Sequence, residues 1–301
     1  MAKVVTKGIN LFKKGIFPVY KEAHVTNAEL IKWIKLTLQF ENPSNKSIWF
    51  NIYPKYFDWY LTGVRIIGFG LHAQQVFSLG RYMQREWLIS ALLGRETLDY
   101  HSSSPLLAEY EYRHITPERI KEALNKFIGE IQQVSPPSLL ENVENKPTQG
   151  DDLISMTSFQ SDDIGCDNRN DDDERAIAEK WSKQTMYIDR KREKFIVNKQ
   201  CHSIDLLELD DALCRFRIIS DGFFNCRAFV HDLGIELGCH AVIHQQNLSR
   251  LGPFNDKQAL HKHELHIKQI IESIEEHRQI ADQYIEDLRR QYPWAKKQRF
   301  I

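Results

Sequence analysis

Asp58 is the residue in the first third of the chain whose type and setting best suit chemistry. It lies in the segment KYFDWYLTGVRIIGFG, residues 55–70, and four aromatic residues surround it: Tyr56, Phe57, Trp59 and Tyr60. A carboxylate in such a segment can serve as a nucleophile or general base. It can equally cap a loop or turn through its side-chain oxygens. The pattern alone leaves both interpretations open.

The histidines and cysteines do not have the spacing of a metal site. His261, His263 and His266 fall in the string HKHELH, which lacks the H-E-x-x-H arrangement of a helical zinc site. The pair His231-Asp232 has no companion set of histidines and carboxylates and is typical of a helix start. The five cysteines are odd in number and contain no C-x-x-C spacing, which favours reduced thiols over disulfides. We expect neither a metal nor an organic cofactor.

Around Asp58 the sequence alternates short strands and helices. Thr26-Asn27 is a helix cap, and Thr116 with Pro117 marks the start of another helix. The expected elements are strands over residues 15–21, 64–67 and 87–94 and helices over residues 26–38, 73–83 and 115–132.

The composition changes abruptly after residue 133. Residues 134–174 are rich in Ser, Pro, Asn and Asp, and such a segment buries too little apolar surface to offset its ordering entropy. We therefore predict a disordered acidic insertion. After it we expect a helix near residues 175–186, strands near 194–197, 204–209 and 212–219, and a long amphipathic helix over 255–290.

Two strings carry a resemblance to a known family. The segment around Asp58 is followed by a small residue and Gly63, then by an apolar strand that ends in Gly-x-Gly. The string SDGFFNCRAFVHDLGIELGCHAVIHQQNLSRLGPF, residues 220–254, contains Arg227 followed by spaced Asp-Leu-Gly, Leu-Gly, Ala and Gly-x-Phe elements. With the opening strand at Gly15 and the Leu93-Gly94 block, these strings resemble the TruB-type pseudouridine synthases over residues 15–254, outside the acidic insertion.

The resemblance implies an α+β fold. A mixed, mostly antiparallel sheet flanked by helices would form the pseudouridine synthase fold. The expected organisation is a basic arm (1–11), the first part of the catalytic domain (12–133), the acidic linker (134–174), the second part of the catalytic domain (175–254) and a C-terminal helical extension (255–301). Bacterial members carry an RNA-binding PUA domain at that last position, and no β-rich sequence for one is present here.

The resemblance also implies an activity, the conversion of uridine to pseudouridine in RNA. Asp58 falls on the family's catalytic aspartate and Arg227 on its active-site arginine, which would hold the carboxylate ionised and oriented. Trp87 replaces the family's tyrosine and would stack on the flipped base. The expected contacts to RNA phosphate come from Lys21, Lys55 and Arg85.

Two other classes of function stay open. The altered segment before Asp58 suits a catalytically silent RNA-binding or assembly protein, and the linker and terminal helix suit an interaction scaffold. The net charge of −1 restricts any RNA-binding surface to a local patch.

The lysine-rich start of the chain, residues 1–21, contains no acidic residue and is compatible with a mitochondrial matrix protein, with a nuclear or cytoplasmic location as the alternative. RNA and other mitochondrial RNA-processing proteins are the expected partners. No apolar run is long enough to suggest membrane insertion.

Overall fold

The computed structural model divides into two compact units, which are described separately. The structure describes residues 13–40, 49–54, 60–134, 196–222 and 224–293. The first unit comprises residues 1–88, 218–223 and 246–301, and the second comprises residues 89–217 and 224–245. Strands β4, β9 and β10 each contribute residues to both. The predicted basic arm (1–11), the acidic segment (135–174), the helix near 175–186, Asp58 and Lys55 lie outside the described residues.

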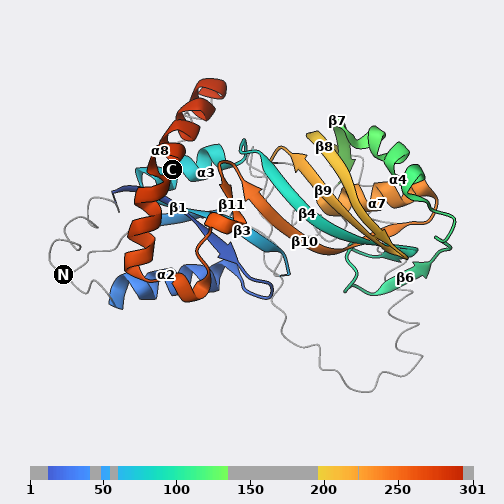
Figure 1. Cartoon of the computed structure of the whole chain (residues 1–301), viewed down its shortest axis with the longest axis horizontal. Coiled ribbons are helices and arrows are strands. Elements are labelled where there is room, and N and C mark those ends of the chain that lie inside the picture. The colour runs from blue at the N-terminus through green and yellow to red at the C-terminus, as the bar shows by residue number, and fades with distance from the viewer. Residues whose placement is uncertain (1–12, 41–48, 55–59, 135–195, 223, 294–301) are drawn as a thin grey trace, which may run out of the picture. The chain divides into compact units, whose positions relative to one another are not determined.

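The first unit is built on a small sheet, in which β1, β3, β10 and β4 are hydrogen-bonded in that order (Figure 1). Strands β1 and β2 run antiparallel to β3, whereas β10 runs parallel to it. The elements of this unit are β1 (Lys14–Lys21), α2 (Asn27–Phe40), β2 (Phe50–Tyr53), β3 (Thr62–Gly70), α3 (Leu71–Gly80), the start of β4 (Arg85–Leu93), the end of β10 (Ala241–Leu251), β11 (Phe254–Asn255) and α8 (Ile267–Gln291).

Local sequence explains where α2 begins. The Thr26 hydroxyl accepts a hydrogen bond from the Glu29 N–H (3.1 Å), and the Glu29 carboxylate accepts one from the Thr26 N–H (2.8 Å). This reciprocal pair is a capping box, which satisfies two amide groups that the helix leaves without intrahelical partners. Leu30, Ile34 and Leu38 are buried one turn apart on the inner face. The predicted helix is confirmed, and Leu36, which points away from this face, is exposed.

Helix α8 completes the core of the first unit. Its residues Ile270, Ile271 and Ile274 join a cluster formed by α2, β1, β2 and β3, whose other members are Phe17, Val19, Leu30, Ile34, Leu38, Ile52, Ile67, Phe69 and Leu265. Burial of several large aliphatic side chains contributes about 1.5–3 kcal/mol each to stability. The C-terminal helix therefore belongs to the first unit.

The C-terminal helix starts later than the sequence pattern indicates. We expected it from residue 255, but α8 begins at Ile267. The backbone of Leu260 instead donates to Pro18 (3.1 Å) and accepts from Tyr20 (2.9 Å), which holds this stretch extended beside β1. His261, His263 and His266 therefore precede the helix instead of lying in it. The His261 ring stacks on the Tyr20 ring, with 4.8 Å between ring centroids.

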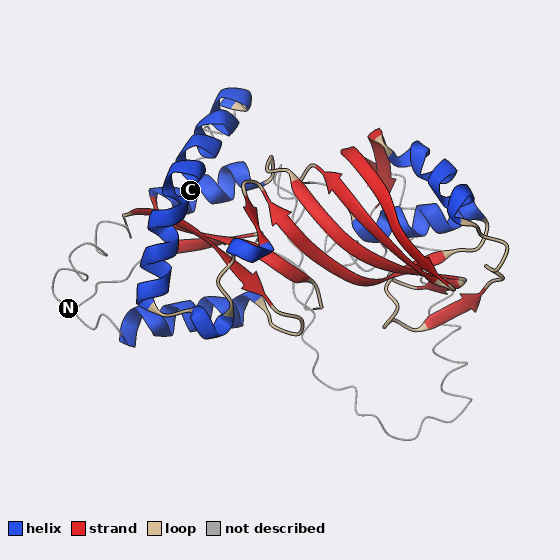
Figure 2. Ribbon diagram, viewed as in Figure 1, coloured by secondary structure: helices blue, strands red, loops and turns tan. Residues whose placement is uncertain are grey.

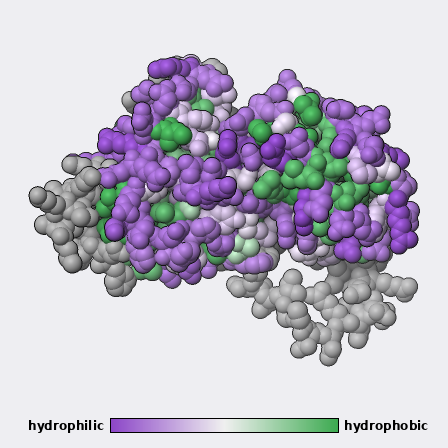
Figure 3. Space-filling model, viewed as in Figure 1, coloured by the Kyte–Doolittle hydropathy of each residue, from purple (hydrophilic) through white to green (hydrophobic). Residues whose placement is uncertain are grey.

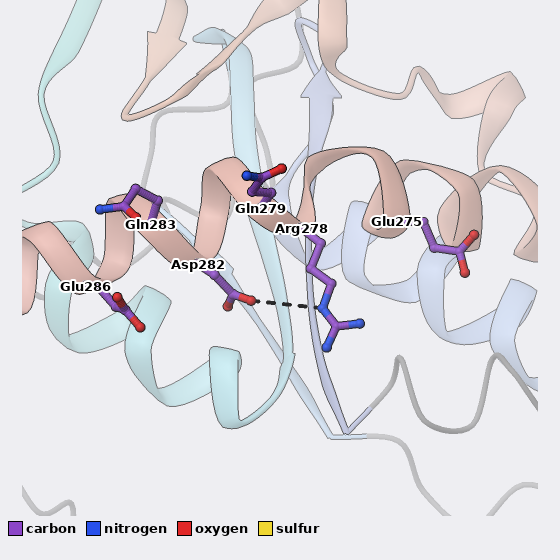
Figure 4. Close-up of a pocket in the computed structure, with 6 residues that line it drawn as sticks. All are labelled: Glu275, Arg278, Gln279, Asp282, Gln283 and Glu286. Carbon is purple, nitrogen blue, oxygen red and sulfur yellow. Dashed lines mark ion pairs between the residues drawn. The ribbon is translucent and has the colours of Figure 1, made fainter.

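An ionic contact ties α8 to the rest of the first unit. Asp282 pairs with Lys14 of β1 (2.9 Å) and with Nε2 of His72 in α3 (3.1 Å). Figure 4 shows Asp282 on α8 beside Arg278, which approaches it at 4.0 Å. Burial lowers the pKa of His72, although Asp282 opposes this effect. Burial also works to raise the pKa of Asp282, but the hydrogen bond and charge of Lys14, together with His72, leave that pKa lowered.

Acidification from pH 7.5 to 5.5 will lower the free energy of unfolding through His72. Because its pKa is depressed in the folded chain, the unfolded chain binds a proton more readily, and the stabilisation present above the ordinary pKa of 6.5 is lost as the pH falls. Urea unfolding at both pH values should give a smaller loss for His72→Gln than for the wild type. His266→Gln, which changes an exposed histidine, should retain the wild-type loss. Equal losses in all three proteins would contradict the role of His72.

The second unit is a larger sheet with helices against it. In this unit β10, β4, β9, β8 and β7 are hydrogen-bonded in that order, and β5 and β6 form a separate pair. Helices α4 and α7 contact each other, and they contact β8 and β7 respectively (Figure 2). The further elements are β5 (Arg95–Thr97), β6 (Leu106–Glu109), α4 (Pro117–Leu124), β7 (Gly129–Val134), β8 (Ile196–Asp210), β9 (Leu213–Ser220) and α7 (Cys226–Leu237). The predicted α+β class, with a mixed, mostly antiparallel sheet flanked by helices, is confirmed.

Two predicted elements of the second unit are wrong in extent. The helix expected over residues 115–132 ends at Leu124, and after a 3-10 turn and Gly129 (φ +96°) the chain becomes β7. Antiparallel pairing of β7 with β8 decides this outcome, because those hydrogen bonds are tertiary. The strands expected near residues 194–197 and 204–209 are one strand, β8.

Candidate functional site

Gly63, five residues after Asp58, is a tightly constrained glycine. Asp58 and Lys55 themselves lie outside the described residues, so their predicted roles stay predictions. Gly63 follows with φ +112°, and a Cβ atom there would collide with the backbone of Leu248 in β10. Thr62 and Gly63 pair in parallel with Asn247 and Leu248. A glycine is required because β10 approaches this point more closely than any side chain allows.

Arg227 is held at the first turn of α7. Asn225 is the N-cap, and its side-chain oxygen accepts from the backbone N–H groups of Arg227 (3.0 Å) and Ala228 (3.2 Å). The Arg227 guanidinium is buried, and its Nη1 donates to the carboxylate and to the backbone carbonyl of Asp99, both at 3.3 Å. A buried guanidinium with a carboxylate partner stays charged and oriented. The predicted pairing of Arg227 with Asp58 lies outside the described residues.

Asp99 is a site residue that sequence reasoning did not select. Its Oδ1 accepts from the His101 N–H (3.0 Å), and its Oδ2 faces Arg227. Between them Tyr100 adopts φ +66°, which forms the turn that directs the carboxylate. The available signal was its position five residues after the Leu93-Gly94 block. The sequence pattern could not show that Asp99 pairs with Arg227, because the two residues are 128 positions apart in the chain.

Trp87 is buried in the first unit. Its side chain is 1% exposed, and the guanidinium of Arg85 lies 6.0 Å from the ring centroid. In this structure its ring is closed to solvent, so stacking on a base requires the ring to be uncovered when RNA binds. The stacking role stays a prediction, and packing is the role that the geometry supports directly.

Replacing Trp87 with Ala will lower the free energy of unfolding by about 3–5 kcal/mol, the usual cost of deleting a large buried aromatic side chain. Chemical denaturation without RNA measures this effect. Trp49→Ala is the matched control, because the Trp49 side chain is 51% exposed and should cost little. Equal stability of the two variants would contradict the buried packing of Trp87.

Lys21 and Arg85 are not placed as phosphate contacts. Lys21 is 1% exposed, and its ammonium group donates to the Leu61 carbonyl at 2.5 Å. Arg85 is 7% exposed and donates to the Tyr53 hydroxyl at 2.8 Å. Contact with phosphate would require both cations to be uncovered when RNA binds, so their predicted role stays a prediction. In this structure Arg85 holds the chain before Asp58, at Tyr53, and Lys21 holds it after Asp58, at Leu61.

A further buried cation lies on β3. Arg65 is fully buried, and its Nη1 donates to the Val64 carbonyl at 2.9 Å. Burial, with a smaller contribution from the charge of Arg85, lowers the pKa of Arg65 to about 9. Arg65 therefore remains a cation at neutral pH. In the sequence, Arg65 falls within a predicted apolar strand, and the pattern gives no sign of its burial.

The described surface includes a polar hollow and exposed hydrophobic residues. A hollow beside α8 is lined by six polar residues of that helix: Glu275, Arg278, Gln279, Asp282, Gln283 and Glu286 (Figure 4). Hydrophobic residues gather over the strands of the second unit (Figure 3). Leu207 of β8 has an exposed side chain. Within the described ranges, His, Cys, Asp and Glu form no group of three that could hold a metal ion. In the same ranges no helix is both long and apolar enough to cross a bilayer.

Comparison with known proteins gives consistent matches. The tRNA pseudouridine synthase B of Parabacteroides distasonis is 22% identical over 191 residues, which are 64% of this chain and 66% of that protein. The protein of the same name from Phocaeicola vulgatus is 35% identical over 75 residues, 25% of this chain and 32% of that protein. The chain thus spans just under two thirds of the first relative and about a third of the second. No protein-family model matches.

The fold agrees with these matches. A chain of a Cbf5-Nop10-Gar1 complex superposes with a TM-score of 0.53 at 16% identity, covering 85% of this chain and 55% of that one. A chain of an H/ACA RNP bound to a substrate RNA containing 2′-deoxyuridine gives a TM-score of 0.51 at 15% identity, covering 85% and 54%. The chain is therefore similar in sequence to proteins named tRNA pseudouridine synthase B and similar in fold to the chains of these two complexes.

Several residues that carry the TruB-like resemblance stabilise α7 and the turn that follows it. Leu233 and Leu237 are buried on α7, and Gly238 ends that helix in the left-handed conformation, φ +76°. A Cβ atom at Gly234 would collide with the backbone of His240 and Ala241, where the chain turns toward β10. Within this block Arg227 is the residue whose type and placement suit chemistry.

Proposed function

We propose that this TruB-like protein is an RNA pseudouridine synthase. The observation that carries the proposal is Arg227, which falls on the family's active-site arginine and is buried, capped and oriented on Asp99. Burying a guanidinium costs free energy, which the pairing of Arg227 with Asp99 helps to offset. Arranged, buried charges of this kind concentrate at functional sites.

The reaction is an isomerisation with no net gain or loss of atoms. The N1–C1′ bond of uridine breaks, the uracil rotates, and a C5–C1′ bond forms. The proton on C5 is then lost, and N1 acquires a proton. Because the reaction involves no redox change and no external group, the chemistry needs a carboxylate and a pocket that orients the base.

In this proposal Asp58 is the reacting carboxylate, acting as a nucleophile at C1′ or as a base at the ribose, and then assisting loss of the C5 proton. Arg227 keeps Asp58 ionised and aimed at the sugar. The target uridine must leave its stack to reach Asp58, which costs a few kcal/mol. Trp87 would support the flipped base once RNA binding uncovers its ring.

We propose RNA of the mitochondrial matrix as the substrate, either mRNA or the tRNA and rRNA pools, with other mitochondrial RNA-processing proteins as partners. RNA is supported by the relatives named tRNA pseudouridine synthase B and by the substrate RNA in a structural neighbour. The mitochondrial location rests on the lysine-rich, acid-free start of the chain. Cell fractionation with the tagged full chain tests it, and a nuclear or cytoplasmic signal would overturn it.

A catalytically silent RNA-binding or assembly protein is the second candidate. The observation that favours it is the burial of Trp87, Lys21 and Arg85, three of the residues expected to contact RNA. Chemical mapping of pseudouridine in RNA from cells with and without the protein distinguishes the two candidates. Loss of specific sites, restored by the wild type but not by Asp58→Asn, supports the enzyme. An unchanged map that includes mitochondrial RNA supports the silent protein.

A further inference from the structure

Gln133, a buried residue of β7, forms a two-point contact with the backbone at the start of α7. Its Nε2 donates to the Asn225 carbonyl at 3.0 Å, and its Oε1 accepts from the Asn225 N–H at 2.8 Å. The side-chain amide thus pairs with one residue as a neighbouring strand would. Gln133 is 3% exposed, so neither hydrogen bond competes freely with water.

Asn225 passes this constraint to Arg227. Its side chain caps α7 by accepting from the Arg227 and Ala228 N–H groups, while its carbonyl also accepts from Phe229 (3.0 Å). The backbone of Arg227 is therefore fixed through Asn225, and its guanidinium is fixed by Asp99. Both ends of the arginine are held within the second unit.

We infer that Gln133 is a positioning residue for Arg227. The inference rests on the proposed function, in which the direction of the Arg227 guanidinium decides how well the reacting carboxylate is held. Loss of the Gln133 contact leaves the N–H of the half-buried Asn225 without this partner. The first turn of α7 then relaxes and the guanidinium moves. Displacement of a positioning group by about 1 Å can lower a rate about 100-fold.

The test compares Gln133→Leu and Gln133→Glu with Gln132→Leu, a control at the exposed neighbouring position on the same strand. The full chain is incubated with RNA from cells that lack the protein, and pseudouridine is mapped over time. We expect Gln133→Leu to lower kcat about 10- to 100-fold with KM within about twofold of wild type. Gln133→Glu keeps the acceptor for the Asn225 N–H but turns the donor into a carboxylate oxygen facing the Asn225 carbonyl, so it should lose about as much as Gln133→Leu. Gln132→Leu should match the wild type.

Two further readouts separate positioning from simple destabilisation. In an Arg227→Lys background, Gln133→Leu should cause little additional loss of kcat, because both changes act on one group. Amide hydrogen exchange across residues 226–229 should accelerate in Gln133→Leu and not in Gln132→Leu. Wild-type kcat in Gln133→Leu, fully additive losses, or unchanged exchange would each overturn the inference. An inactive wild type would instead contradict the proposed function, and the exchange experiment would still decide whether Gln133 holds Arg227.

Discussion

Asp58→Asn will reduce pseudouridine formation by at least about 10³-fold while leaving RNA affinity and stability nearly unchanged. The amide has almost the shape of the carboxylate, but it can neither attack C1′ nor accept a proton, and such roles are worth about 10²–10⁴-fold or more. The measurement is single-turnover conversion of uridine in RNA from cells that lack the protein. RNA affinity is measured by filter binding on the same preparation.

Asp210→Asn is the matched control for Asp58→Asn. Asp210 is an exposed residue at the end of β8 and should tolerate the same chemical change with full activity. Wild-type turnover by Asp58→Asn would show that another residue carries the reaction. Loss of RNA binding together with activity would show that Asp58 serves affinity instead of chemistry.

Arg227→Ala will abolish detectable turnover or reduce it by about 10²–10³-fold, the range found when one preorganised charge-stabilising group is removed. Removal of the guanidinium also leaves Asp99 without its ion-pair partner, so the free energy of unfolding should fall by about 1–3 kcal/mol. A pH–rate profile gives the more specific result. In Arg227→Lys, whose cation is shorter and lacks the forked geometry, the acidic limb should move to higher pH, because the reacting carboxylate is held ionised less effectively.

Arg215→Ala controls for the loss of a positive charge. Arg215 is an exposed residue of β9 whose partner is Glu208, and surface pairs of this kind contribute about 0–1 kcal/mol. It should keep the wild-type rate and profile. An unchanged acidic limb in Arg227→Lys would mean that Arg227 does not act on the reacting carboxylate, even if activity is reduced.

The variants Asp58→Asn and Arg227→Ala also distinguish the two candidate functions. In an enzyme, Asp58→Asn and Arg227→Ala both lose turnover while RNA affinity is retained. In a silent binding protein neither variant changes the pseudouridine map. Asp99→Asn tests the contribution of the ion pair with Arg227. It keeps the side-chain oxygen that accepts from the His101 N–H and removes the charge opposite Arg227.

Features that depend on residues close together in the chain could be predicted from the sequence. Capping at Thr26 and Thr116, the opening strand β1 and the Arg227-containing block could all be read from neighbouring residues. Caps and hydrophobic periodicity act over one or two turns, so their signals survive without knowledge of the fold. The family resemblance could likewise be stated from spaced strings alone, and the comparisons agree with it.

The way in which the site is held depends on contacts that form only in the folded chain. The contact between Arg227 and Asp99 joins residues 128 positions apart, and that between Gln133 and Asn225 spans 92. The change from predicted helix to β7 has the same origin, because pairing with β8 outweighs local preference. The burial of Trp87 and Lys21 could not be predicted from the sequence either. Hydropathy gives the tendency of a residue type to be buried, whereas the packing of the fold determines which side chains are covered. Local chemistry selects candidate residues, whereas long-range hydrogen bonds and packing determine which of them are positioned to act.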